Sequence, residues 1–231
     1  MMKITILPVG STEHHGGHLS VETDWIIPVY VAEQLKKELR EFEVQLLSPI
    51  KVSPLVSTRE SPGSVDVPAD IFNKSVVEAV KGLETDLLII LTGHGGKKIF
   101  ACLALVTQEI NEKFGFDVVA LHYLDIIPKE KLQQNPNYEH AGEIETSLML
   151  AIAPDKVSKD YKKRKPSYPT NQFRWKYPEY SKNVLSMFLK DDLRTMAYWG
   201  EPASASAEKG KEFLKSIIAE LAGTIRAIVC G

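Results

Sequence analysis

The chain has 231 residues, 44% of them hydrophobic and 25% charged, with a net charge of −2 at neutral pH. This length supports one domain over residues 1–231 with a large buried core, and the small net charge gives no reason to expect nucleic acid or an anionic membrane as a partner. Two widely separated cysteines, Cys102 and Cys230, imply no disulfide framework, and the apolar run in "MMKITILPVG" is too short for a signal peptide or a membrane span. We therefore expect a cytoplasmic protein.

Apolar runs rich in β-branched residues alternate with helical patterns along the first half of the chain. The spacing of apolar residues predicts strands over residues 3–10, 44–54, 86–94 and 117–125. It predicts helices over residues 24–42, 68–84 and 97–115, with Asp70 as a candidate N-cap of the second and Gly115 ending the third. The run "DLLIILTGH" is continuously apolar, which is typical of a parallel strand buried on both faces. This alternation predicts a three-layer α/β/α fold with a mostly parallel central sheet.

The pattern changes after residue 125. Residues 140–154 indicate a loop that runs into a helix ended by Pro154, and residues 203–229 a long amphipathic closing helix. Residues 155–183 are basic, aromatic and interrupted by prolines, which favours a long ordered loop.

Two polar segments follow predicted strands. The first, "GSTEHHGGHLSVETD", comes after strand 3–10, and the second, "TGHGGKK", comes at the end of strand 86–94. Because ligands of open α/β sheets collect at the carboxyl ends of parallel strands, both segments should open onto one crevice. The acidic segment "HAGEIET", residues 140–146, could form a third wall of it.

The residues in these segments suit a metal centre. Zinc, manganese and iron(II) accept the oxygen and nitrogen donors of Glu13, His15, Asp24 and His94. Glu13 and His15 are two positions apart, so in an extended loop they point the same way. A carboxylate such as Asp24 can bridge two cations that activate a water between them, and glycines such as Gly95 leave room for a substrate.

Other interpretations of these histidines stand beside the metal centre. A single histidine after a strand often only caps or forms hydrogen bonds, but clustered histidines and carboxylates are costly to bury without a cation. His14 should point away from the cluster, and His18 could support the cluster or face the substrate. His122 lies within a predicted strand, which favours a structural role. The "GHGG" loop before Lys97 and Lys98 could instead bind phosphate at a helix start, although no GKS or GKT motif accompanies it.

The third segment also has two interpretations. Glu143 and Glu145 fit the first turn of a helix, where carboxylates interact favourably with the helix dipole. His140, followed by the small residues Ala141 and Gly142, is instead typical of an active-site loop. The residues alone leave both open.

Four segments, in this order along the chain, together resemble the creatininase (creatinine amidohydrolase) family. They span residues 7 to about 213 and are "LPVGSTEHHGGHLSVETD", "LTGHGGKK", "HAGEIETSLMLAIAP" and "GEPASASAEKGKEF". The resemblance implies a three-layer α/β fold and assembly into a homohexamer. It also implies two divalent metal ions per chain (Zn²⁺, Mn²⁺ or Fe²⁺) and hydrolysis of a non-peptide or cyclic amide C–N bond.

The resemblance also assigns roles to particular residues. It places metal ligands on Glu13, His15, Asp24 and His94, with Asp24 bridging, and a substrate-side, candidate catalytic histidine on His140. A further glutamate ligand of creatininase falls on Gly96 here. Glu145 is the candidate that replaces it.

Departures from the family pattern bear on the substrate. The segment "VSTRESPGSVDV" lacks a histidine found in relatives, and the tryptophans that enclose creatinine have no secure counterparts, although Trp175 and Trp199 lie in the right half of the chain. Arg174 and Trp175 could offer a cation and a stacking face to an anionic heteroaromatic compound. Residues 155–183 could equally be a solvated loop or a subunit contact. We expect a formamide or a small heterocyclic amide rather than creatinine.

The leading hypothesis is a metal-dependent amidohydrolase in which a metal-activated water attacks a small-molecule amide or formamide. Gly95, His140 and Trp175 are then the candidate substrate contacts. The competing hypothesis is a non-catalytic small-molecule binding or assembly protein that retains the fold, and Gly96 in place of a glutamate ligand favours it.

Overall fold

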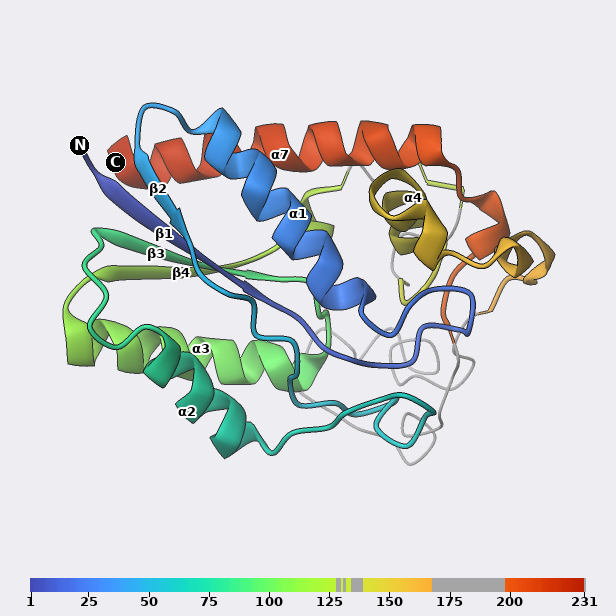
Figure 1. Cartoon of the computed structure of the whole chain (residues 1–231), viewed down its shortest axis with the longest axis horizontal. Coiled ribbons are helices and arrows are strands. Elements are labelled where there is room, and N and C mark those ends of the chain that lie inside the picture. Colours follow the sequence, from blue (N-terminus) through green and yellow to red (C-terminus); the bar gives the residue numbers. More distant parts are fainter. Residues whose placement is uncertain (128–129, 131, 134–138, 168–197, 231) are drawn as a thin grey trace, which may run out of the picture.

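The computed structural model describes residues 1–127, 130, 132–133, 139–167 and 198–230 (Figure 1). Its centre is a four-stranded, entirely parallel sheet in the order β2-β1-β3-β4. The strands are β1 (Lys3–Val9), β2 (Glu43–Leu46), β3 (Leu87–Thr92) and β4 (Asp117–His122).

Helices cover both faces of the sheet, which confirms the predicted three layers (Figure 1). On one face lie α1 (Thr23–Glu38), α4 (Glu143–Ile152) and α7 (Ala207–Cys230), and on the other α2 (Ala69–Ala79) and α3 (Lys97–Phe114). Short 3-10 helices are η1 (Tyr123–Ile126), η3 (Pro154–Lys156), η4 (Lys159–Lys163) and η6 (Pro202–Ser204).

The continuous apolar run of β3 is explained by the two cores that it joins. Leu87, Ile89 and Leu91 pack in the core beneath α1 and α7, whereas Leu88 and Ile90 pack in the core beneath α2 and α3. Successive strand residues point to opposite faces, so a strand covered on both sides needs apolar residues at every position.

Several predicted boundaries were wrong, among them the end of the helix predicted over residues 68–84, which stops at Ala79. The strand predicted over residues 44–54 stops at Leu46 and meets β1 again only through a single bridge between Val9 and Ile50. Pro8 and Pro49 lack the N–H groups that a continuous ladder would need there. Helix α1 ends at Glu38 instead of residue 42, and Pro68, not Asp70, is the N-cap of α2. Gly115 does end α3 in the left-handed conformation, with a φ of 77°.

Part of the segment predicted as a long loop packs against the first polar segment. The backbone N–H of Ser158 donates to the His18 carbonyl at 2.7 Å, and Leu19 forms an isolated bridge with Val157. Residues 155–167 are thus ordered, as predicted, while residues 168–183, with Arg174 and Trp175, lie outside the described residues.

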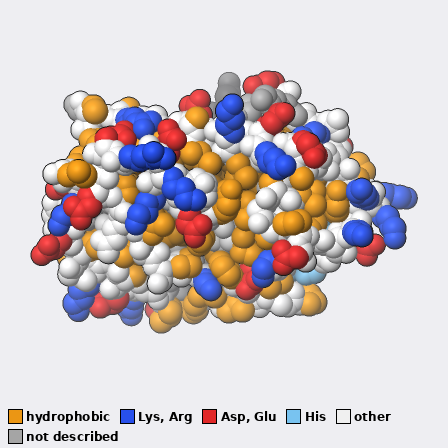
Figure 2. Space-filling view, turned by 45° about the horizontal axis from the view of Figure 1, so that its top comes forward, with side chains coloured by type: hydrophobic (Ala, Val, Ile, Leu, Met, Phe, Trp, Pro, Cys, Tyr) orange, Lys and Arg blue, Asp and Glu red, His pale blue; other side chains and the backbone are white. Residues whose placement is uncertain are grey.

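The surface over α1 and α7 carries lysine and arginine interspersed with aspartate and glutamate, together with apolar side chains (Figure 2). Among the described residues no helix is long and apolar enough to cross a membrane.

Candidate metal centre

The sheet brings the two polar segments together. Strands β1 and β3 are parallel neighbours, and their last residues, Val9 and Thr92, lie opposite each other in the ladder. The loops that follow them therefore leave the same edge of the sheet, where α1 begins and carries Asp24. Gly10 and Gly93 make this approach possible: a Cβ atom would lie 2.3 Å from the Asp24 carbonyl oxygen at Gly10 and 2.0 Å from it at Gly93. These two glycines make room for the backbone of α1.

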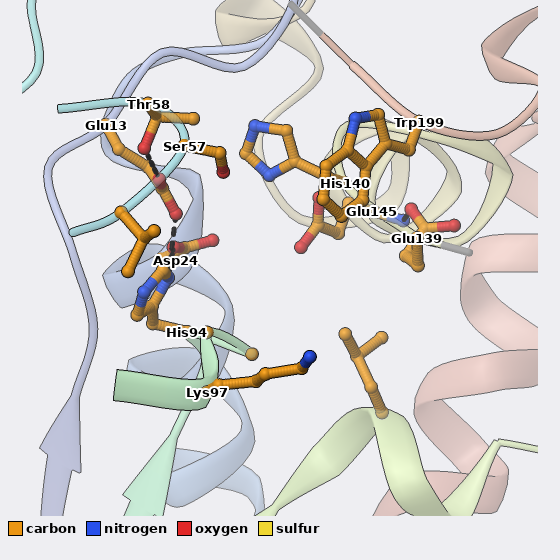
Figure 3. A pocket seen from close by; sticks show the side chains of 14 residues that line it. Glu13, Asp24, Ser57, Thr58, His94, Lys97, Glu139, His140, Glu145 and Trp199 are labelled. Atoms are coloured by element: carbon orange, nitrogen blue, oxygen red, sulfur yellow. Dashed lines mark hydrogen bonds and ion pairs between the residues drawn. The ribbon is translucent and has the colours of Figure 1, made fainter. Parts of the chain in front are cut away.

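One group of donors surrounds the Oδ2 atom of Asp24. The Nδ1 atom of His94 lies 3.1 Å from this oxygen and 2.7 Å from Oε1 of Glu13 (Figure 3). Two hydroxyls hold the carboxylates in place: Ser11 donates to Asp24 Oδ2 at 2.7 Å, and Thr58 donates to Glu13 Oε2. Three candidate metal-binding side chains thus converge here, from the loop after β1, from α1 and from the loop after β3.

A second group of donors surrounds the other oxygen of Asp24. The Nε2 atom of His15 lies 3.0 Å from Asp24 Oδ1 and 3.6 Å from Glu145 Oε2. On its far side, Nδ1 of His15 donates to the Glu13 carbonyl at 2.9 Å, which directs Nε2 into the cluster. Within each group the candidate ligand atoms lie within 4.8 Å of one another, and Asp24 belongs to both groups.

The electrostatics of the cluster fit cations. Glu13, Asp24 and Glu145 are at most 3% exposed, so three carboxylates are withdrawn from water. Burial alone would lower the pKa of His15 and of His94, but the adjacent carboxylates outweigh it and raise each pKa to about 10. Burial also raises the pKa of Glu145 to about 8. Without metal, protons on the two imidazoles therefore balance the negative charge of the carboxylates. Divalent cations would balance the same charge, and carboxylate oxygens and imidazole nitrogens are ligands that such cations prefer.

Segment 140–146 contains both the first turn of a helix and a carboxylate that faces the cluster. Glu145 is in the first turn of α4 and accepts the backbone N–H of Ala141 at 2.5 Å, but the same carboxylate faces His15. Glu143 turns the other way and pairs with Lys209 at 2.6 Å. Ala141 itself is buried with a φ of 51°, a strained conformation for a residue other than glycine, and this turn directs Glu145 toward the cluster.

His140 lies over the cluster (Figure 3). Its ring is 4.5 Å from that of His15, and its Nε2 atom is 2.9 Å from the His14 carbonyl. Because a carbonyl only accepts, Nε2 carries the proton of the neutral ring and Nδ1 is left as an acceptor. Burial, followed by the charge of His15, lowers the pKa of His140 to about 4, so the ring is neutral near pH 7. Trp199 joins His140 through a backbone bridge, with its ring 6.4 Å away.

The remaining histidines have separate environments. His14 contacts the site through its backbone carbonyl. His18 is buried outside the cluster, and its Nε2 atom lies 3.1 Å from the Ala141 carbonyl and 3.2 Å from the Thr146 hydroxyl. His122 packs between the rings of Phe100 and Tyr123.

The cluster opens into a cavity of about 220 Å³. Gly95, His140 and Trp199 line it, whereas Trp175 lies outside the described residues. Sequence reasoning missed Glu139, whose carboxylate accepts the backbone N–H groups of Gly142 and Glu145 at 2.9 and 3.0 Å. A carboxylate three or four residues ahead of a helix is the signal that could have identified it as a cap.

Comparisons with known proteins identify the family of the chain and agree with its fold. The family model described as Creatininase: Creatinine amidohydrolase matches residues 1–225. A creatinine amidohydrolase of Pseudomonas putida is 28% identical over 246 residues, covering 96% of this chain and 88% of the relative. A mycofactocin precursor peptide peptidase of Mycolicibacterium smegmatis is 27% identical over 167 residues, covering 69% of this chain and 62% of the relative.

Solved structures show the same fold. A tryptophan-to-phenylalanine mutant of creatininase superposes with a TM-score of 0.77 at 24% identity, over 97% of this chain and 90% of that chain. Others include a glutamate-to-glutamine mutant described as Zn-Zn type, with a TM-score of 0.73 at 24% identity, and a manganese form of creatininase, with a TM-score of 0.74 at 22% identity. Each covers 97% of this chain and 90% of the other. With a family model that spans nearly its whole length, this chain belongs to the creatininase family.

Proposed function

We propose that this protein is a metal-dependent amidohydrolase that cleaves a non-peptide C–N bond, in a cyclic amide or a formamide. The observation that carries the proposal is the sharing of Asp24 between two groups of metal donors, one on each carboxylate oxygen. Membership of the creatininase family and the zinc and manganese forms of similar structures support it.

Each group would hold one divalent cation, Zn²⁺, Mn²⁺ or Fe²⁺. Glu13, His94 and Asp24 would hold one cation, and His15, Glu145 and Asp24 would hold the other. When bound, two such cations supply an acidified water and a Lewis acid for a carbonyl oxygen. Every other contribution comes from the surrounding side chains.

Glu145 replaces the glutamate that is Gly96 in this chain. A Cβ atom at Gly96 would lie 2.5 Å from His94 Nε2, so a side chain there would displace His94 from its present position. Glu145 instead reaches the centre from α4, on the side of His15. This exchange keeps the number of carboxylates at the centre while leaving position 96 without a side chain.

His140 acts on the substrate through hydrogen bonding. Its proton is held on Nε2 by the His14 carbonyl, so Nδ1 can accept the N–H of an amide in the cavity and fix its orientation. A pKa of about 4 makes the ring a weak base, which favours orientation over proton uptake. Gly95 and the ring of Trp199 form further walls against which the substrate would lie.

Activity assays with controlled metal content test the function. Protein freed of metal with a chelator and reloaded with zinc, manganese or iron(II) is offered creatinine, formamidopyrimidine nucleotides and short peptides. We expect hydrolysis of a non-peptide amide that chelator abolishes and metal restores. Metal-independent turnover, or hydrolysis of the peptides alone, would contradict the proposal.

A non-catalytic binding protein is the second candidate, because Gly96 removes one ligand of the family pattern. Chelation separates the two functions, since such a binder retains affinity for its ligand without metal. Assembly into a homohexamer is part of the same proposal, by family resemblance, and light scattering of the purified protein measures it directly.

A further inference from the structure

The walls of the cavity carry an uneven distribution of charge. Four carboxylates line it, those of Glu13, Asp24, Glu139 and Glu145, and among the described residues Lys97 is the one lysine or arginine in the lining. Figure 3 shows Lys97 extending from the start of α3 into the cavity, on the side away from the rings of His140 and Trp199. The proposed chemistry gives this lysine no task.

Metal binding would change the charge balance around Lys97. Two divalent cations would neutralise the four carboxylates, and the histidines bind metal as neutral ligands. Lys97 then adds one positive charge to the described part of the lining, enough to offset a hydroxide on the cations. Since the walls exclude part of the solvent, this charge acts on a bound molecule more strongly than it would at an open surface.

We propose that Lys97 makes the enzyme selective for amides that carry an anionic group, a carboxylate or a phosphate, beside the bond that is cleaved. The inference rests on the proposed two-metal function and names the class of substrate for that site. An uncharged amide such as creatinine lacks the group that the lysine ammonium would bind. A structural role for Lys97, in which it only offsets the charge of Glu139, would give no preference for anionic ligands.

Hydroxamates, which chelate metal ions, provide probes of matched length. Acetohydroxamate is uncharged, whereas malonic monohydroxamate and phosphonoacetohydroxamate add a carboxylate and a phosphonate to the same carbon. Their dissociation constants are measured by calorimetry on zinc-loaded protein, for wild type, Lys97→Met and Lys97→Glu. The readout is the ratio of the dissociation constants of the charged and uncharged probes for each protein. Each probe has its own intrinsic affinity for zinc, and this difference cancels when the ratio is compared between proteins.

We expect wild type to favour the charged probes about fivefold more than Lys97→Met does, and Lys97→Glu to reverse the preference. Raising the ionic strength should reduce it, since salt screens charges open to solvent. The larger change for the carboxylate or for the phosphonate identifies which anion fits. Lys98→Met is the matched control, because Lys98 is adjacent in sequence but does not line the cavity, and it should retain the wild-type ratio.

The same ratio in wild type and Lys97→Met would overturn the inference, as would failure of every hydroxamate to bind zinc-loaded protein. Zinc content, measured first on each sample, keeps this result separate from the proposed function. Absence of bound zinc contradicts the two-metal centre, whereas bound zinc without a charge preference contradicts only the role of Lys97.

Discussion

The two sides of the candidate centre are built from different kinds of structure. The strand-end side, made of Glu13, His94 and Asp24 Oδ2, lies on loops that leave two adjacent strands, and the hydroxyls of Ser11 and Thr58 hold its carboxylates. The loop side, made of His15, Glu145 and Asp24 Oδ1, joins the first polar segment to the distant helix α4. It depends on the left-handed turn at Ala141, and His18 forms a hydrogen bond with the carbonyl of that residue.

The two sides therefore depend on different features of the fold. The strand-end side follows directly from the order of the parallel strands, so it should tolerate changes elsewhere in the chain. The loop side depends on a strained backbone and on one buried histidine, so its metal should be the more easily lost. The substitutions below test the two sides separately.

The largest effect should come from Asp24→Asn, because Asp24 belongs to both sides. We expect loss of both metal ions and of measurable hydrolysis, since the amide lacks the charge needed to bridge two cations. Metal content after dialysis measures it. His14→Ala is the control and should keep both ions, because His14 meets the site through its backbone. Similar metal contents in the two variants would contradict the bridging role.

Glu13→Gln and Glu145→Gln should each cost one ion, from opposite sides. Glutamine at position 145 keeps an acceptor for the Ala141 N–H but loses the negative charge, so the turn can persist without a charged ligand. Metal titration should show one tight site remaining in each variant. If Glu145→Gln retains both ions, Glu145 only accepts the Ala141 N–H and holds the turn before its helix.

His18→Phe should weaken the loop side alone. The substitution leaves the Ala141 carbonyl and the Thr146 hydroxyl unpaired in the interior, which costs about 1–3 kcal/mol and loosens the turn that places Glu145. We expect the second metal to bind about tenfold more weakly, while the first is unchanged. His18→Gln retains a hydrogen-bond donor, so its affinity for the second metal should lie between those of wild type and His18→Phe. Equal weakening of both ions by His18→Phe would show a general loss of structure.

A smaller effect should appear in the pH dependence of stability. Without metal, the pKa values of His15 and His94 are about 10, above the ordinary 6.5, and that of Glu145 is about 8, above 4.5. Groups that hold protons more tightly when folded stabilise the protein below their unfolded pKa and lose this contribution as pH rises through the folded value. The metal-free protein should therefore lose stability as pH rises, from about pH 4.5 to 8 through Glu145 and from about pH 6.5 to 10 through His15 and His94.

Bound cations replace these protons and remove that loss. The difference in Tm between metal-loaded and metal-free protein should consequently grow with pH over this range. Thermal unfolding with and without chelator measures it. A difference that stays constant or shrinks as pH rises would contradict the protonated state of the empty cluster.

The strand-end side and the layers of the fold could be predicted from the sequence because both follow from local patterns. The continuous apolar run of β3 and the polar segments after β1 and β3 fix an edge of a parallel sheet, and this edge brings Glu13 and His94 together. Glu145 could not be placed in this way. Its position depends on the backbone turn at Ala141, and an alanine carries no sequence signal for a left-handed conformation.

Other features depended on tertiary contacts. Glu139 caps α4 from outside the helix, and Trp199 reaches the cavity because its backbone pairs with His140, far away in sequence. The early end of β2 follows from Pro8 on β1 together with Pro49 just after β2, and the pattern of one segment alone does not reveal this pairing.

The central claim is that two cations share Asp24, and anomalous X-ray diffraction from zinc-loaded crystals tests it most directly. The account predicts two anomalous peaks per chain, one between Glu13 and His94 and the other between His15 and Glu145, with the Asp24 carboxylate between them. A single peak, or a second peak away from Asp24, would contradict it.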